Sequence, residues 1–434
     1  MPLSQYCKIY PLSDAPGQVM LFSTRTTAVV HVSREVLHDI EKGVLSPEEE
    51  RTLSEEGFFT EAPEKERQEL ISYIDDLNKL TKTFTAVLVL NLSCNLACKY
   101  CFEGTRKGAF FMSAETADAF IGFLQSGVLD GKEEIELIFY GGEPLLSANM
   151  VYRITSEVRA FAEAQNIKFT FSLITNGTLL TRQLVEKLKP LGMRAASITL
   201  DGPREVHDAF RPFRSSQGSF DTIVRNIKEV CSLIDVQMGG NYTRDHFREF
   251  PRLLDYLLDT GGLTQADISV VRFDPVVNES RDMAPPDFHD GCMSYDEPWL
   301  REATVFLREE ILKRGFRTHK VEPAVCFVER RSNVVVNYDG ALYRCPGLIG
   351  RRDYCTGSVR SGSSDYRGTH NLDNWKNEEC LACAYIPLCF GGCRYMKLVR
   401  DGHMQGVDCK KAYFDRTLEA LVMQDVKYDK GDEL

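Results

Sequence analysis

The chain has 434 residues, which is enough for two to four domains and a sizeable hydrophobic core. Its hydrophobic content of 43% and charged content of 26% are typical of a soluble globular protein. A net charge of −11 argues against nucleic-acid binding, and no apolar run approaches the roughly 18 residues of a membrane helix. The first residues lack the basic segment and apolar run of a secretory signal, so we expect a cytoplasmic protein.

Residues 1–82 are expected to form a separate small unit with a winged-helix-like fold. Alternation of apolar residues across 18–32 predicts a pair of strands. Two short helices are predicted over 33–42 and 46–56, because a serine that can cap the helix opens each segment. A charged helix over 61–80 would then lead into the next domain.

Strand-like and helix-like segments alternate through residues 83–290. The predicted strands are 85–92, 135–140, 168–175, 195–200, 236–242 and 268–273. The predicted helices include 113–125, 149–165, 181–191, 220–233 and 243–260. Six such repeats predict an α/β fold with a parallel sheet, closed into a partial (β/α)6 TIM-like barrel. The working face of such a barrel lies at the carboxyl ends of its strands.

The loop CNLACKYC follows the first predicted strand and places Cys94, Cys98 and Cys101 on this working face. Three thiols make a poor disulfide set, because one is always left over. They suit an iron–sulfur cluster that normally takes four thiolates, and one iron would then stay open for a ligand. A zinc knuckle is the structural alternative.

A second motif ends the next strand, where Gly141 and Gly142 precede Glu143 and Pro144. Adjacent glycines allow the backbone to approach a ligand closely, and the carboxylate can accept a hydrogen bond from an ammonium group. An ordinary turn at the end of a strand is the alternative interpretation.

Together these motifs resemble the CxxxCxΦC loop and the GGEP segment of the radical S-adenosylmethionine (SAM) superfamily, with Tyr100 at the aromatic position. The resemblance implies a [4Fe–4S] cluster whose open iron binds SAM, and reductive cleavage of SAM to a 5′-deoxyadenosyl radical. It also implies SAM contacts from the GGEP residues. Further SAM contacts that it implies come from Asn176, Thr199, Arg211 and Phe273.

Cysteines dominate residues 326–434, which follow a bridging segment over 291–325. A hairpin over 333–336 and 341–344 is the main predicted regular structure, and a helix should end the domain. The cysteine spacing resembles that of SPASM domains, which hold two auxiliary [4Fe–4S] clusters, and a zinc ribbon is the alternative. The resemblance assigns an outer cluster to Cys380, Cys383, Cys389 and Cys409, and an inner cluster to Cys326, Cys345 and Cys393.

Two departures from the SPASM pattern bear on the chemistry. The inner cluster lacks its usual fourth cysteine, so Cys292 or Cys355 reaches in, or one iron stays open to a substrate thiolate. Sulfatase-maturing relatives carry an aspartate directly after the cysteine that corresponds to Cys345. Here Pro346 stands at that position, which argues against sulfatase maturation.

The resemblance implies a maturase that abstracts hydrogen from a ribosomally made precursor peptide and forms a thioether or another crosslink. Expected partners are this peptide and an electron donor such as flavodoxin or ferredoxin. The first 82 residues would hold the leader of the peptide on a strand edge. Alternatives are an oxidase or decarboxylase of a cofactor-precursor peptide, a radical SAM enzyme acting on a small molecule or a protein, and a non-catalytic metal-cluster binding module.

Overall fold

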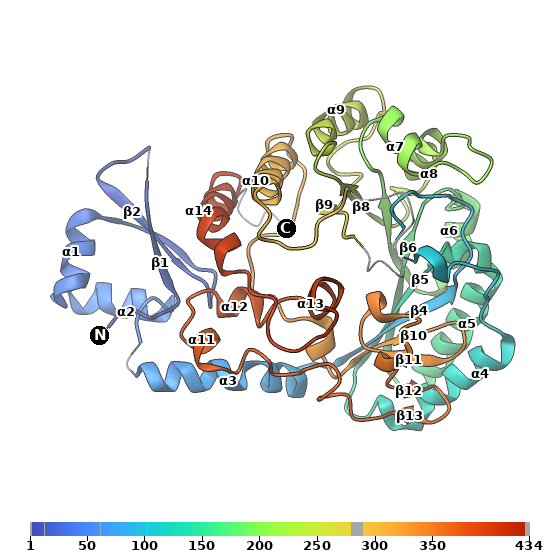
Figure 1. The fold of residues 1–434 in the computed structure, drawn as a ribbon, viewed down its shortest axis with the longest axis horizontal. Helices are drawn as coiled ribbons and strands as arrows, with labels where there is room; N and C mark the ends of the chain where they lie inside the picture. The colour runs from blue at the N-terminus through green and yellow to red at the C-terminus, as the bar shows by residue number, and fades with distance from the viewer. Residues whose placement is uncertain (1, 13, 61, 102, 279–289, 430–434) are drawn as a thin grey trace.

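The computed structural model describes residues 2–12, 14–60, 62–101, 103–278 and 290–429 (Figure 1). Two sheets organise this part of the chain, one of three strands near the N-terminus and one of ten strands. Within the ranges given, no helix is both long enough and apolar enough to cross a membrane.

The three-stranded sheet is antiparallel, in the order β1-β2-β3, and three helices follow it. Its elements are β1 (Cys7–Pro11), β2 (Gln18–Ser23), β3 (Val29–Ser33), α1 (Arg34–Lys42), α2 (Pro47–Glu55) and α3 (Pro63–Leu80). The predicted capping serines do cap, because Ser33 accepts from the N–H of Val36 and Ser46 accepts from that of Glu49. β1 is a strand that the apolar pattern did not predict. None of its side chains is fully buried, so its sequence shows no clear alternation of apolar and polar residues.

Six parallel strands in chain order form the barrel part of the large sheet. They are β4 (Thr83–Asn91), β5 (Glu134–Gly141), β6 (Lys168–Thr175), β7 (Met193–Thr199), β8 (Asp235–Tyr242) and β9 (Val270–Pro275). The helices between them are α4 (Ala114–Phe123), α5 (Ala148–Ala164), α6 (Arg182–Leu188), α7 (Arg204–Phe210), α8 (Phe220–Val230) and α9 (Phe250–Asp259). The α/β fold with a partial barrel is therefore confirmed, and α7 is a short helix that the pattern missed.

The predicted helix over 243–260 is too long at its start, because α9 begins only at Phe250. Pro251 occupies the first turn of α9, where its missing N–H costs nothing. The residues before it form a turn and the 3₁₀ helix Phe247–Glu249.

The cysteine-rich region extends the barrel sheet instead of standing apart from it. β10 (Asn333–Val336) pairs in parallel with β4, with Val335 opposite Val87, and forms the predicted hairpin with β11 (Ala341–Tyr343). The remaining elements are β12 (Gly357–Ser358), β13 (Gly362–Ser363), α10 (Pro298–Lys313), α11 (Glu378–Leu381), α12 (Ile386–Cys389), α13 (Arg394–Asp401) and α14 (Lys411–Lys427). The full strand order is β13-β12-β11-β10-β4-β5-β6-β7-β8-β9.

The two ends of the chain share one hydrophobic core. Met20 and Phe22 of β2 pack with Leu388 of α12 and with Leu418 and Val422 of α14. Figure 1 shows the N-terminal sheet beside α12 and α14, while α10 runs next to α14. The N-terminal unit therefore packs on the cysteine-rich region.

Candidate active site

A cavity of about 490 Å³ lies where the barrel strands end. The three cysteines of the loop after β4 line it, together with residues from the ends of the other barrel strands. The residues at the strand ends are Tyr140, Gly141, Gly142, Thr175, Asn176, Thr199, Asn241, Pro275, Val276 and Val277. The cysteine-rich region closes one side of the cavity. The parallel topology thus collects side chains from distant parts of the sequence at one opening.

The cysteine loop is held by backbone hydrogen bonds to the end of α7 and to the segment that follows it. The N–H of Ala97 donates to the carbonyl of Pro212, and that of Lys99 donates to the carbonyl of Phe210, at 2.8 and 3.0 Å. Two polar contacts reach one of the sulfurs: the Leu96 N lies 3.4 Å and Asn176 Nδ2 lies 3.7 Å from Cys94 Sγ. The loop is therefore held rigidly before any ligand binds.

The electrostatic surroundings fit a thiolate-bound cluster. Burial raises the pKa of the Cys98 thiol to about 11, while the nearby Arg211 guanidinium opposes that rise. Burial also raises the pKa of Cys94. Lys107 forms a side-chain hydrogen bond to Cys101, an interaction that raises the lysine pKa. Three soft thiol donors with two cations beside them match the charge that a thiolate-bound iron–sulfur cluster requires.

Gly141 and Gly142 line the cavity and also contact the backbone at the start of the cysteine loop. Gly142 N–H donates to Asn91 O at 3.0 Å, and Glu143 N–H donates to Ser93 O at 2.8 Å. A Cβ on Gly141 would collide with the carbonyl of Asn91, and one on Gly142 with that of Ser93. Gly141 also has φ = 140°, which side chains disfavour. The pair is thus required by the close approach of β5 to the start of the cysteine loop.

Glu143 and Pro144 lie behind the cavity wall and are absent from its lining. The Glu143 carboxylate is fully buried and accepts from the N–H groups of Leu145 and Asn176 and from the hydroxyl of Thr175, at 2.8–2.9 Å. Burial raises its pKa, and these hydrogen bonds oppose the rise. Glu143 therefore fastens the ends of β5 and β6 to each other.

A buried polar network lies beneath the cysteines. Tyr100 donates its hydroxyl proton to Asp201 and accepts from Arg211 at 2.8 Å and from Asn241 at 3.1 Å. Arg211 also lies 3.7 Å from Asp201, and both side chains are almost fully buried. Tyr100 and Arg211 thus meet at the cavity, with Asp201 as their shared partner.

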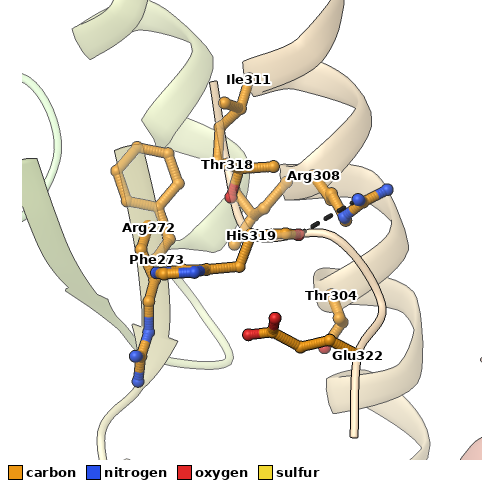
Figure 2. Close-up of a pocket in the computed structure, with 9 residues that line it drawn as sticks. Arg272, Phe273, Thr304, Arg308, Ile311, Thr318, His319 and Glu322 are labelled. Atoms are coloured by element: carbon orange, nitrogen blue, oxygen red, sulfur yellow. Dashed lines mark hydrogen bonds between the residues drawn. The ribbon is translucent and has the colours of Figure 1, made fainter. Parts of the chain in front are cut away.

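Thr199 and Asn176 line the cavity, but Phe273 does not. Its ring packs against Phe250 of α9 with centroids 4.5 Å apart. Phe273 instead lines a second pocket between β9 and α10, together with residues such as Arg272 and Arg308 (Figure 2). The contact with Phe250 places the Phe273 ring on the side of β9 that α9 covers. Phe273 is therefore the one predicted SAM contact outside the GGEP segment that does not line this cavity, and its contact with SAM stays a prediction.

Several cavity residues were not predicted, among them Lys107, Asn241, Tyr395 and Glu103. Glu103 is 4% exposed, and both of its carboxylate oxygens lack a hydrogen-bond partner among the described residues. Burial raises its pKa to about 7, while the charges of Lys107 and Arg106 oppose the rise. The sequence could have indicated Glu103 as a cavity residue, because it lies only two residues after Cys101, the last predicted cluster ligand of the loop.

Cys345 reaches the same cavity from the turn after β11, together with Pro346 and Gly347. Burial raises the Cys345 pKa, and the nearby thiols of Cys326 and Cys393 add to the rise. The structure thus gathers these three cysteines beside the barrel opening. The barrel triad and Cys345 lie far apart in sequence and share one cavity only because the chain folds back.

A second group of cysteines lies near α11 and α12. Burial raises the pKa of Cys380, and the neighbouring thiols of Cys409 and Cys383 add to the rise. Burial also raises the pKa of Cys389, and the thiols of Cys383 and Cys380 add to that rise. No three His, Cys, Asp or Glu side chains of the described ranges converge on the position of one metal ion. The cysteines of a four-iron cluster bind separate irons, so they stand further apart than the ligands of a single ion.

The two spare cysteines differ in position. Cys292 is 1% exposed and lies in the barrel core. Its backbone pairs with that of Val277 in an isolated β-bridge. Cys355 is exposed, and its thiol lies 3.3 Å from the carbonyl of Gly357.

A model of the radical SAM superfamily matches residues 88–257. An uncharacterized protein of Methanocaldococcus jannaschii, MJ0907, is 30% identical over 301 residues, 69% of this chain and 95% of that protein. Fe-coproporphyrin III synthase of Methanosarcina barkeri is 30% identical over 187 residues, 42% of this chain and 43% of that enzyme. The cysteine-type anaerobic sulfatase-maturating enzyme of Clostridium novyi is 22% identical, covering 76% and 93%.

Solved structures with a similar fold include anSMEcpe with bound AdoMet, which has a TM-score of 0.64 and 17% identity and covers 81% of this chain and 97% of that chain. Streptococcus suis SuiB bound to its precursor peptide SuiA has a TM-score of 0.54 and 14% identity, and covers 94% and 98%. The cysteine loop, the barrel and these matches agree. The chain belongs to the radical SAM superfamily and is an enzyme that binds SAM and a [4Fe–4S] cluster.

Proposed function

We propose that the chain is a peptide maturase, which abstracts hydrogen from a residue of a ribosomally made precursor peptide and closes a thioether or another crosslink. The observation that carries this proposal is the shared cavity, into which both the Cys94–Cys98–Cys101 loop and Cys345 project. A cavity of about 490 Å³ falls within the range of ligand-binding sites in proteins. The similarity to a sulfatase-maturating enzyme and to SuiB bound to its precursor peptide supports a peptide substrate.

The barrel residues would prepare the cavity for this chemistry. When bound, SAM and the reduced cluster supply a 5′-deoxyadenosyl radical. Cys94, Cys98 and Cys101 would hold the cluster, while Asn176, Thr199 and Arg211 line the space for SAM. Ile174, Val276 and Val277 give the cavity apolar walls that exclude water from the substrate residue.

The cysteine-rich region would hold two auxiliary [4Fe–4S] clusters that accept the surplus electron. We assign Cys326, Cys345 and Cys393 to the inner one, on the side of the cavity, and four further cysteines to the outer one. The outer set is Cys380, Cys383, Cys389 and Cys409. The neighbouring thiols that raise the pKa of Cys345 are those of Cys326 and Cys393 and not those of Cys292 or Cys355, so we propose that one inner iron takes no protein thiolate. That position suits a thiolate of the peptide, and flavodoxin or ferredoxin would supply the electrons.

The N-terminal unit would bind the leader of the peptide. β3 is an edge strand, and a groove of about 610 Å³ separates it from α14. Val29 and His31 of β3 and Val422 and Val426 of α14 line this groove. An extended leader could add a strand to β3 there, which is a common mode of peptide recognition.

Anaerobic reconstitution tests the proposed function. Iron and sulfide are counted per chain, and 5′-deoxyadenosine is measured after dithionite reduction in the same sample. About 12 irons correspond to three four-iron clusters. Cys98→Ala should lose about four irons and all 5′-deoxyadenosine. Zinc in place of iron, or no 5′-deoxyadenosine from a fully loaded protein, would contradict the proposal.

A further inference from the structure

Glu103 is the only acidic side chain that lines the cavity within the described part of the chain. It is 4% exposed, and neither carboxylate oxygen has a hydrogen-bond partner there. Buried carboxylates in folded proteins are normally hydrogen-bonded or paired with a cation. A buried carboxylate whose oxygens accept no hydrogen bond from the described residues therefore requires an explanation.

The local backbone does not use this carboxylate. Glu103 directly precedes the 3₁₀ helix Gly104–Arg106, a position from which an acidic side chain can cap the free N–H groups. It makes no such bond. The turn is closed by main-chain bonds instead, from Gly104 N–H to Cys101 O at 2.9 Å and from Arg106 N–H to Glu103 O at 2.8 Å.

The cations of the cavity are engaged elsewhere. Lys107 forms its side-chain hydrogen bond with Cys101. Arg211 donates to Tyr100 at 2.8 Å and lies 3.7 Å from Asp201. The charges of Lys107 and Arg106 also act on Glu103, but no hydrogen bond from a described residue reaches its oxygens, so the carboxylate keeps its acceptor capacity for a molecule that enters the cavity.

Glu143 offers a direct comparison in the same part of the barrel. It is as deeply buried as Glu103, but it accepts three hydrogen bonds from protein donors and lies behind the cavity wall. One carboxylate is thus part of the structural framework. The other lines the cavity and has no hydrogen-bond partner among the residues that the structure describes.

We propose that Glu103 is a substrate-binding carboxylate, which accepts a hydrogen bond from a side-chain N–H, O–H or S–H donor of the polypeptide residue held in the cavity. This inference rests on the proposed function. A substrate residue without a side-chain donor would leave the carboxylate buried and unpaired, and such a mismatch disfavours binding strongly. Glu103 would therefore select donor-bearing residues over apolar ones of similar size.

Two matched variants of the reconstituted holoenzyme, Glu103→Met and Glu143→Met, test the assignment without any substrate. Replacing an unpaired buried carboxylate removes a desolvation penalty, so Glu103→Met should raise the thermal midpoint by about 2 °C. Glu143→Met should lower the midpoint, because three protein donors lose their acceptor. A lower midpoint for Glu103→Met would show a structural role and overturn the proposal.

Binding measurements then identify the source of the donor. The probes are SAM and synthetic peptides of equal length whose central residue is Ser, Cys, Asn or Lys, or else Ala or Val. The wild type should bind the donor-bearing peptides about 10-fold more tightly than the Ala and Val peptides, and Glu103→Met should lose this preference while its affinity for SAM stays unchanged.

Equal binding of all peptides by the wild type, or no binding, would contradict the proposal. A roughly 10-fold loss of SAM affinity in Glu103→Met would also overturn it, because the donor would then belong to the cofactor. Formation of 5′-deoxyadenosine by the wild type without peptide reports separately on the proposed function. A failure of that function is thus distinguishable from a failure of the Glu103 assignment.

Discussion

At the scale of single residues, contact distances around Gly141 and Gly142 govern the cysteine loop. The loop can start where it does only because β5 approaches the backbone of Asn91 and Ser93 without a Cβ between them. The same approach allows Gly142 and Glu143 to bond those two carbonyls. Small size at these positions therefore fixes the geometry of the predicted cluster ligands.

Gly142→Ala should destabilise the protein by about 1–3 kcal/mol, because its Cβ has no space beside the Ser93 carbonyl. The cysteine loop must shift, so iron bound per chain should also fall. Chemical denaturation and an iron assay measure the two effects. Gly122→Ala in α4 is the control, since its Cβ meets open space and alanine favours helices. Equal iron content in both variants would contradict the prediction.

His207 makes the stability of the same face depend on pH. Burial lowers its pKa well below the ordinary value near 6.5. The ring accepts from the N–H of Asp201 at 3.1 Å, and Ser219 lies 2.9 Å from its other nitrogen. The Ser219 hydroxyl donates to Arg211 O, so the ring donates to Ser219 and is neutral.

The unfolded chain binds a proton at His207 below about pH 6.5, while the folded chain resists it until a lower pH. The contribution of His207 to stability is thus complete above pH 6.5 and is lost as the pH falls toward the folded pKa. Denaturation curves between pH 7.5 and about 5 should show this loss, and His207→Gln should flatten it. The exposed His38→Gln is the control. An unchanged slope in His207→Gln would contradict the assignment.

At the scale of elements, β10 links the cysteine-rich region to the barrel. It is hydrogen-bonded on one side to β4, the strand that leads into the cysteine loop, and on the other to β11, which leads to Cys345. The cysteine loop after β4 and Cys345 after β11 therefore both follow strands of one sheet, with only β10 between those strands. This arrangement explains why Cys345 faces the same cavity as the triad.

Val335→Pro should disrupt both sets together. Val335 is fully buried, pairs with Val87 and Tyr343, and would lose a ladder hydrogen bond and its backbone geometry to proline. Iron content should fall by more than the share of the inner cluster. Val335→Ala keeps the N–H, so it should lower stability and retain the iron. Loss of inner-cluster iron alone from Val335→Pro would show that the two sites are independent.

At the scale of the whole molecule, the first and last segments of the chain stabilise each other. β2 supplies Met20 and Phe22 to a core completed by α12 and α14. Thr24 also donates its hydroxyl proton to Ala384 O at 2.5 Å, and Gln5 donates to Leu381 O at 2.9 Å. Burial of these apolar side chains between the units favours one fixed orientation.

Phe22→Ala should cost about 3–5 kcal/mol, since its side chain is 1% exposed in the core between the units. Because α12 carries Cys389, the outer group of cysteines should also loosen. Limited proteolysis and iron counting under anaerobic conditions would measure both effects. The half-buried Tyr10 is the comparison, and Tyr10→Ala should cost less. Retained protease resistance in Phe22→Ala would mean that the N-terminal unit is held by other contacts.

The sequence by itself predicted the features that depend on local spacing. The β/α alternation follows from apolar periodicity, and the cysteine loop is readable because Cys94, Cys98 and Cys101 lie within eight consecutive residues. The capping serines at 33 and 46 are local for the same reason. Phe273 shows the limit, because a strand pattern gives the period of two but not which face turns toward the cavity.

Tertiary structure decided which residues meet. The pairing of β10 with β4 joins Cys345 to the triad's cavity, and no local pattern encodes a parallel pairing between segments so distant in sequence. The partners of a buried carboxylate are set in the same way. Glu143 and Glu103 are the same residue type, each close to a recognisable motif, but only the folded chain gives one three donors and leaves the other to the cavity.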